Sequence, residues 1–374
     1  MRRRAYMEKK QREARRRQIW TVAAAAGICA LIILFIILVI HAVSSRRSAH
    51  ASNTEDAGVS TTAPTDQRAE HPALSAPTYT TATPPEKDHR PPKPVVHRPA
   101  MAKNVTVLGD TIDSANAALI SLEDNTILAH KGGNERIYPA SMTKIMTLLV
   151  AYEQLENLEE TFTVTSGIID PLYLAEASLA GFSPGETVTV RDLLYGTVLP
   201  SGAEAAVSLA ILTAGSEEDF VALMNEKAKE MGLTHTHFTN CSGLHDKDHY
   251  SSCTEIAMIL AYAMQYDVCR EILSTYRYTT EPTNKHPEGV SMVSTMFSRM
   301  YGDEADGVTV IAGKTGYTHQ AGQCLASYAT ADGTDLAYIL VTAGAEGKFE
   351  PIFDALDIYS DYVPKPETNE TPIG

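Results

Sequence analysis

Apolar and polar residues are distributed unevenly along the 374-residue chain. Residues 22–40 form an uncharged, almost wholly apolar run of 19 residues, and a stretch rich in Ser, Thr, Ala and Pro follows it. The first run is long enough to cross a bilayer as a helix, whereas the second cannot bury a core. We therefore expect five regions: a basic segment (1–21), a transmembrane anchor (22–43), a disordered linker (44–103), a folded domain (104–363) and a polar tail (364–374).

Within the folded region, the spacing of apolar residues predicts both strands and helices. Residues 117–122 and 126–131 flank Glu123-Asp124-Asn125 and predict a β-hairpin. Helical spacing begins at Ser141 and continues to Tyr152. Further helices are expected at 190–198, 203–212, 217–231, 254–265 and 354–359, and strands at 307–312, 323–330 and 336–343, with a turn at Asp332-Gly333. This order predicts a mixed α/β fold in which helices cover an antiparallel sheet.

Charge separates the N-terminal part from the rest of the chain. Residues 1–47 contain eleven Lys or Arg and two Glu, a balance of +9, so the remainder must carry −24 to give the total of −15. An acidic domain argues against nucleic-acid binding, which requires a basic surface. Basic residues before the apolar run outnumber Arg46 and Arg47 after it, which predicts a cytoplasmic N-terminus and a single-pass protein of the cell membrane with an extracellular domain. A cleaved signal peptide is the alternative, because Ala42-Val43-Ser44 is typical of a cleavage site.

The chain has five cysteines, of which Cys29 lies in the apolar run. The other four would face an oxidising exterior, where disulfides persist. Cys241 and Cys253 bracket one short loop and can pair. Small buried thiols are the alternative, and the sequence leaves both possibilities open.

The first candidate for catalytic chemistry is Ser141 with Lys144 three residues later. On a helix, residues i and i+3 share one face, so the amine can lie beside the hydroxyl. Serine needs a nearby base to become a nucleophile, and lysine is such a base where burial or a neighbouring cation lowers its pKa. The alternative is a helix-capping serine followed by a solvated lysine. If Ser-x-x-Lys were the only motif, this alternative would be favoured.

Two further motifs change this interpretation. Ser201 lies at a break between predicted helices, where its hydroxyl can pass a proton between Lys144 and a leaving group. The run Lys314-Thr315-Gly316 follows a predicted strand and offers a cation for a substrate carboxylate, a hydroxyl donor, and a glycine that permits close approach of a substrate backbone. Each motif alone is common in ordinary helix caps and strand ends. In this order they describe a serine acyl-transfer site and match the motifs of penicillin-binding proteins and serine β-lactamases, apart from Ala203.

Three other kinds of site fit the sequence less well. A nucleotide-binding P-loop needs four residues between its first glycine and Gly-Lys, but five separate Gly307 from Gly313. Cys324 has no evident base partner and is more typical of a packed strand thiol. A zinc peptidase would need a defined ligand spacing, which is missing from the histidine-rich loop. The histidines of that loop are His235, His237, His245 and His249.

With these residues in view, the region from about Asn104 to Tyr359 resembles the serine-type D-alanyl-D-alanine carboxypeptidases, the low-molecular-mass penicillin-binding proteins. The resemblance implies an antiparallel sheet flanked by helices, with a helical subdomain. The segments that carry it are residues 138–144 (YPASMTK), 199–202 (LPSG), 236–240 (THFTN), 243–245 (GLH), 249–251 (HYS) and 313–317 (GKTGY).

The resemblance also assigns roles to individual residues. Ser141 is implied to be the acylated nucleophile, Lys144 the general base and Ser201 the proton-relay serine. The residues implied to bind substrate are Lys314, Thr315, Gly316 and Tyr317.

The implied reaction removes the terminal D-alanine from a peptidoglycan stem peptide that ends in D-Ala-D-Ala. It proceeds through an acyl-enzyme on Ser141, and β-lactams would be trapped on the same serine. The backbone N–H groups of Ser141 and Tyr317 would form the oxyanion hole, where one donor is typically worth about 10²–10³ in rate. No metal or organic cofactor is implied.

One departure from the family pattern lies beside the relay serine. The family usually has Asn at the position of Ala203, where its amide would contact the substrate and help to orient the lysine. Glu204 is adjacent, but on a helix it points about 100° away from Ala203. We expect an active enzyme with an altered rate or substrate preference. The alternatives are a catalytically weak or inactive penicillin-binding sensor or scaffold, and a β-lactamase, although no matching Glu motif is found.

Overall fold

The computed structural model describes residues 93–300 and 304–365. The predicted basic segment, the transmembrane anchor at 22–43, most of the linker and nearly all of the polar tail lie outside the described residues. Within the two described ranges, no helix has the length and apolar character needed to cross a bilayer.

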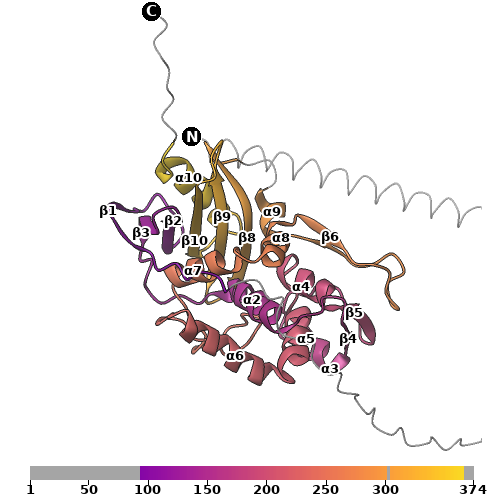
Figure 1. Cartoon of the computed structure of the whole chain (residues 1–374). Coiled ribbons are helices and arrows are strands. Elements are labelled where there is room, and N and C mark those ends of the chain that lie inside the picture. Colours follow the sequence, from indigo (N-terminus) through magenta and orange to yellow (C-terminus); the bar gives the residue numbers. More distant parts are fainter. Residues whose placement is uncertain (1–92, 301–303, 366–374) are drawn as a thin grey trace, which may run out of the picture. The chain divides into compact units, whose positions relative to one another are not determined.

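A six-stranded sheet forms the centre of the domain, with strand order β1-β3-β2-β10-β9-β8 (Figure 1). Neighbouring strands are antiparallel except β1 and β3, which run parallel. The predicted antiparallel sheet flanked by helices is therefore present, and the parallel pair at its edge makes the sheet mixed. The strands are β1 (Ala100–Val107), β2 (Asn116–Ser121), β3 (Thr126–Lys131), β8 (Val308–Thr318), β9 (Gly322–Ala331) and β10 (Ala337–Ala345).

Strand β1 brings the end of the predicted linker into the domain. Its residues are partly or fully exposed, so they lack the alternation of apolar and polar positions that marks a half-buried strand. Earlier residues are also attached, because Lys93 pairs with Glu230 at 2.7 Å and the Val95 N–H donates to Gln265 Oε1 at 2.9 Å. The folded domain thus begins before residue 104, the expected boundary.

The two faces of the sheet are covered by different helices (Figure 1). Successive side chains of a strand point to opposite faces, and β2 accordingly divides its residues between two cores. Ala118 and Ile120 belong to the core that contains α7 (Cys253–Ala263). Ala117 and Leu119 belong to the core that contains α10 (Glu350–Tyr362). Burial of both faces explains why this strand shows a continuous apolar run.

A helical lobe shares the core on the α7 face. Local signals define its helices: Thr189 and Asp192 form a capping box that begins α4, Gly215 ends α5 with a φ of 87°, and Ser216 caps α6. The helices of this lobe are α2 (Lys144–Gln154), α3 (Ser166–Leu174), α4 (Val190–Val198), α5 (Ala203–Ala214), α6 (Glu217–Glu230) and α8 (Asp267–Ser274).

Short elements connect these layers. A 3-10 turn, η1 (Ala140–Thr143), precedes α2, and α9 (Thr295–Met300) lies shortly before β8. Two small ribbons complete the described elements: β4 (Thr161–Val164) with β5 (Glu186–Thr189), and β6 (Arg277–Thr279) with β7 (Ser291–Val293).

The predicted hairpin, the helices at 190–198 and 254–265, and the turn at Gly333 are confirmed within one or two residues. Two differences affect the site. The helix expected from Ser141 begins at Lys144, because the preceding residues form a 3-10 turn. The strand expected to end at residue 312 continues to Thr318, because β9 pairs with it along this whole length.

The pairing of Cys241 with Cys253, one of two possibilities in the sequence, is not formed. All four cysteines of the described residues are free and buried. The Cys241 thiol instead donates to Glu217 Oε1 at 3.2 Å, and Cys253 begins α7. Burial raises the pKa values of the Cys241 and Cys253 thiols well above the usual range for cysteine, so both thiols stay protonated.

Candidate active site

Ser141 and Lys144 lie side by side where the turn η1 meets α2. Side chains at i and i+3 eclipse in a 3-10 turn, which brings this pair together more directly than an α-helix would. Lys144 Nζ lies 3.2 Å from Ser141 Oγ and donates a hydrogen bond of 2.5 Å to the backbone oxygen of Ser242. The structure therefore places the predicted nucleophile within hydrogen-bond distance of the predicted base.

The amine of Lys144 is removed from water. Its residue is 2% exposed, and burial lowers its pKa to about 8. The charges of Glu204 and Glu217 oppose this shift, but no carboxylate among the described residues forms an ion pair with the amine. Near neutral pH a minor part of Lys144 is consequently uncharged, far more than for an ordinary lysine, and this form can accept a proton.

Ser201 and Lys314 form a second pair in the same cleft. Ser201 lies between α4 and α5, and its hydroxyl accepts a hydrogen bond of 2.9 Å from Lys314 Nζ. The same amine donates to the backbone oxygen of Thr315 at 2.9 Å. Ser201 has a φ of 69°. This left-handed conformation is energetically unfavourable for any residue other than glycine. The turn between α4 and α5 thus holds this hydroxyl against the strand that carries Lys314.

Lys314 is also buried, at 1% exposure. Burial lowers its pKa well below the usual value, and the charges of Lys144 and Arg299 lower it further. Arg299, in α9, donates to Gln323 Oε1 at 3.2 Å and to the backbone oxygen of Lys348 at 3.4 Å. Burial lowers the pKa of Arg299 too, yet a guanidinium stays charged at physiological pH. The cleft therefore favours an anionic group.

Close backbone contacts hold β8 and the loop after α6 against η1. A Cβ on Gly316 would lie 3.1 Å from the Ser141 nitrogen and 3.0 Å from the Pro139 oxygen. A Cβ on Gly243, which has a φ of 79°, would lie 2.0 Å from the Ala140 oxygen. Gly316 thus lies close to the backbone that carries Ser141, and the close approach of a substrate backbone to Gly316 stays a prediction.

These elements enclose a cleft of about 400 Å³. The site residues predicted from the sequence that line this cleft are Ser141, Lys144, Ser201, Thr315, Gly316 and Tyr317. Lys314 lies behind this lining and donates a hydrogen bond to Ser201. Thr315 Oγ1 lies 2.7 Å from Thr295 Oγ1, and Tyr317 is 54% exposed at the rim.

Several cleft residues lie outside the motifs found in the sequence. They are Glu176, Ala177, Ser178, Ser242, Thr295 and Arg299. Most of them lie in segments without a motif, so no sequence signal pointed to them. Ser242 adjoins a segment that resembles the family, but its role depends on a backbone oxygen, which residue identity does not reveal.

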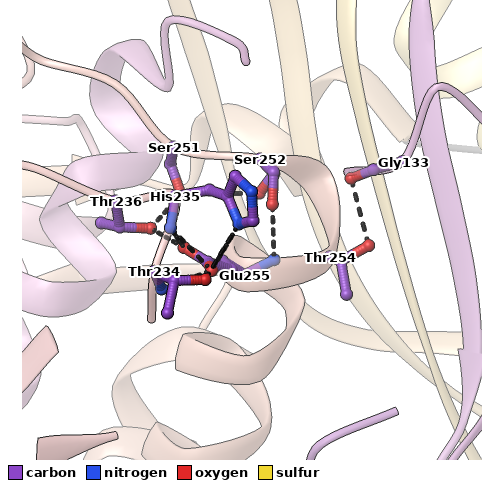
Figure 2. Close-up of polar contacts among 8 residues, drawn as sticks. All are labelled: Gly133, Thr234, His235, Thr236, Ser251, Ser252, Thr254 and Glu255. Carbon is purple, nitrogen blue, oxygen red and sulfur yellow. Dashed lines mark hydrogen bonds and ion pairs between the residues drawn. The ribbon is translucent and has the colours of Figure 1, made fainter. Parts of the chain in front are cut away.

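The loop that presents the Ser242 oxygen is fixed at its base by Glu255, in the first turn of α7 (Figure 2). The Glu255 carboxylate accepts N–H groups of Thr234 at 2.7 Å and of His235 at 2.9 Å, and the Thr236 hydroxyl also donates to it. A carboxylate with several donors forms strong, short hydrogen bonds. Glu255 thereby orders the chain that leads to the Lys144 contact.

His249 supports the catalytic turn from behind. Its Nδ1 accepts the N–H of Thr239 at 3.1 Å, so the proton is on Nε2, which donates to Thr143 Oγ1 at 2.7 Å. Burial lowers the pKa of His249 to about 4, which keeps the ring neutral near neutral pH. This contact fixes the residue between Ser141 and Lys144.

The histidines considered for a zinc site have other partners. His237 Nδ1 forms a hydrogen bond of 2.7 Å with the Asp248 backbone oxygen. The His245 and Tyr138 rings pack in a T-shaped arrangement, with their centroids 4.7 Å apart. Across residues 93–300 and 304–365, no three His, Cys, Asp or Glu side chains are grouped so that they could hold a metal ion.

Comparison with known proteins gives relatives of one kind. D-alanyl-D-alanine carboxypeptidase DacF of Bacillus subtilis is 36% identical over 240 residues, which cover 62% of this chain and 58% of DacF. DacC of Escherichia coli, also named a D-alanyl-D-alanine carboxypeptidase, is 35% identical over 46% of this chain and 44% of its own length. The chain thus spans about half the length of these two relatives.

Solved structures and a family comparison agree with these relatives. The Streptomyces K15 DD-transpeptidase superposes with a TM-score of 0.61 at 28% identity, over 68% of this chain and 98% of that one. The peptidase family described as D-alanyl-D-alanine carboxypeptidase matches residues 101–346, which include every motif described above. Through this match, which covers more than half of the chain, the chain belongs to the D-alanyl-D-alanine carboxypeptidase family of penicillin-binding serine peptidases.

Proposed function

We propose that the domain is a serine-type D-alanyl-D-alanine carboxypeptidase that removes the terminal D-alanine from peptidoglycan stem peptides. The observation that carries this proposal is the 3.2 Å approach of the buried Lys144 amine to Ser141 Oγ. Lys314 and Ser201, joined at 2.9 Å, complete the cleft. Family membership supports the same reaction.

Acylation begins when the uncharged Lys144 amine takes the proton of Ser141. The hydroxyl oxygen then attacks the carbonyl carbon between the two D-alanines, and negative charge develops on the carbonyl oxygen. The N–H groups of Ser141 and Tyr317 are proposed to stabilise this oxyanion. The contact between Gly316 and the Ser141 nitrogen supports this assignment, because it brings the two backbones together.

Collapse of the tetrahedral intermediate breaks the C–N bond. The proton held by Lys144 passes to the leaving amine through Ser201, whose hydroxyl is oriented by Lys314. D-alanine departs, and Ser141 remains as an ester. Water then attacks the ester carbonyl, with Lys144 again as the base, and regenerates the serine. A β-lactam would form the same ester at Ser141.

The terminal carboxylate of the substrate fits the positively charged end of the cleft. Arg299 donates to two neutral oxygens and has no carboxylate partner among the described residues. A partly buried guanidinium in this state gains from an incoming carboxylate, as does Lys314. Thr315 adds a hydroxyl at the same place. We therefore assign the carboxylate to Arg299, Lys314 and Thr315.

We also propose that residues 22–43 anchor the protein in the cell membrane, with the domain outside and β-lactams reaching it there. The uncharged run of 19 residues and the excess of basic residues before it support this arrangement. The full chain should sediment with membranes after high-salt washing, and a chain lacking residues 1–43 should stay in the supernatant. Recovery of the intact full chain in the supernatant would overturn the anchor.

Replacement of Ser141 tests the reaction itself. Ser141→Ala should lower D-alanine release from a pentapeptide by about 10³-fold or more, because the nucleophile is lost. Mass spectrometry after penicillin treatment should find an adduct on the wild-type peptide that contains Ser141 and none on the variant. Well-folded wild-type protein that releases no D-alanine would contradict the carboxypeptidase assignment and leave a penicillin-binding sensor.

The pH dependence tests the role of Lys144. Its amine acts as a base only when uncharged, and burial lowers its pKa to about 8. The acylation rate should therefore rise with pH and level off above about 8, rather than above the ordinary lysine value. Stopped-flow acylation by a β-lactam with constant charge measures this profile. A rate that is flat from pH 6 to 9 would remove Lys144 as the titrating base.

Arg299→Leu tests the carboxylate assignment. Loss of a charged hydrogen bond should lower kcat/KM for a D-Ala-D-Ala peptide by about 10- to 100-fold. The loss should shrink for a peptide whose C-terminus is an amide, because no carboxylate is then present. Arg277→Leu, an exposed substitution in β6, is the matched control. Equal losses on both peptides would show that Arg299 does not bind the carboxylate.

A further inference from the structure

One wall of the cleft is formed by a segment that none of the catalytic motifs includes. Glu176, Ala177 and Ser178 line the cleft between α3 and β5. We call residues 176–181 the wall segment. It lies beside Ala203, where this chain lacks a polar side chain next to the relay serine.

The wall segment is fastened to the start of α5 by two sets of contacts. The Ala203 N–H donates to the Ser178 backbone oxygen at 2.8 Å. Glu204 Oε1 accepts the N–H groups of Ala180 at 2.6 Å and Gly181 at 3.0 Å. Glu204 thus supplies an acceptor for two donors of a segment without regular structure.

Burial of Glu204 is costly, which argues that its contacts matter. The residue is 0% exposed, and its second carboxylate oxygen has no hydrogen-bond partner among the described residues. Burial raises the pKa of this carboxyl group. An unsatisfied buried oxygen destabilises the folded state unless the chain gains elsewhere. The gain that the structure shows is the fixed position of the wall segment.

Backbone strain gives independent support. Among the described residues, the non-glycine residues with positive φ are Asn125, Ala140 (47°), Glu176 (53°) and Ser201 (69°). Ala140 directly precedes Ser141, and Ser201 and Glu176 line the cleft. Such strain persists only where the surroundings enforce it, and it concentrates at functional sites. The wall segment shares this property with the two catalytic turns.

The hydroxyl of Ser178 is available for a ligand. The hydroxyls of the other serines and threonines that line the cleft each have a hydrogen-bond partner: Ser141 with Lys144, Ser201 with Lys314, Ser242 with Asn240, Thr295 with Thr315, and Thr318 with Ala321. Within the described part of the chain, Ser178 has no such partner for its hydroxyl, and the residue is exposed in the cleft wall. It can donate and accept a hydrogen bond.

We propose that the Ser178 hydroxyl binds the peptide backbone of the substrate beside Ala203, and that Glu204 is the positioning residue that holds Ser178 there. The substrate class is a peptide with a backbone amide on the acyl side of the scissile bond. This inference rests on the proposed carboxypeptidase function. It adds a contact that orients the acyl segment while Ser141 attacks.

Kinetics of three variants test the proposal. Ser178→Ala should lower kcat/KM for the pentapeptide by about 3- to 10-fold, the range of one neutral hydrogen bond, with most of the change in KM. Glu204→Ala should lower it at least as much. Glu204→Gln should remain close to wild type, because its amide oxygen can still accept the two N–H groups. Ser166→Ala, at an exposed serine outside the cleft, is the matched control.

A double variant separates positioning from general destabilisation. If Glu204 acts through Ser178, Ser178→Ala combined with Glu204→Ala should lose no more than Glu204→Ala alone. Thermal unfolding of each variant reports stability separately. Additive losses, or a Ser178→Ala variant with wild-type KM, would overturn the proposal. Should Glu204→Ala fail to fold, Ser178→Ala and Glu204→Gln still decide it.

Binding without turnover keeps this test independent of the proposed reaction. In the Ser141→Ala background, calorimetry with the same pentapeptide should show about 3- to 10-fold weaker binding when Ser178→Ala is added. Equal affinity would overturn the role of Ser178 whether or not the wild type releases D-alanine. A wild type that binds the peptide through Ser178 but releases no D-alanine would overturn only the carboxypeptidase function.

Discussion

The burial of two lysine amines in one cleft is the constraint on which the rest of the site depends. Lys144 and Lys314 are 2% and 1% exposed, and neither forms an ion pair with a carboxylate of the described residues. Their N–H groups donate to neutral oxygens, those of Ser242, Ser201 and Thr315. Neutral acceptors satisfy the donors without replacing the lost hydration of a charge, so burial lowers the pKa of both amines. The same desolvation makes Lys144 a base, while the charged guanidinium of Arg299 favours an anion in the cleft.

Such burial requires three distant segments to pack with little space between their backbones. Gly316 and Gly243 allow β8 and the loop after α6 to contact the turn before α2: a Cβ on Gly243 would collide with the Ala140 oxygen, and a Cβ on Gly316 would make tight contacts. The turns at Ala140 and Ser201 accept left-handed backbone conformations, which cost of order 1–3 kcal/mol each. The cores on both faces of the sheet offset these costs. Two of the four strained non-glycine residues of the described ranges thus lie at the turns that present the two serine hydroxyls.

The sequence predicted the parts of the site that depend on local spacing. Ser141 and Lys144 could be paired because three residues separate them, and the mixed α/β class followed from the order of strands and helices. Arg299 and Ser178 could not be found, because only tertiary packing brings α9 and the wall segment to the cleft. Strand β1 was missed for another reason: its exposed residues leave no alternating pattern, and its parallel pairing with β3 is set by the path of the chain.

The turn after α4 connects substrate positioning with proton transfer. Gly202 contacts the wall segment so closely that a Cβ there would lie 2.7 Å from the Ala180 side chain, and Ala203 and Glu204 bond to the same segment. Ser201 precedes these residues directly, so a shift of the wall segment moves the relay hydroxyl as well. Because Ala203 adds only a methyl group, the proposed Ser178 contact would supply the polar group at this place. The wall segment proposed to position the substrate and the relay serine are thus joined through one tightly packed turn.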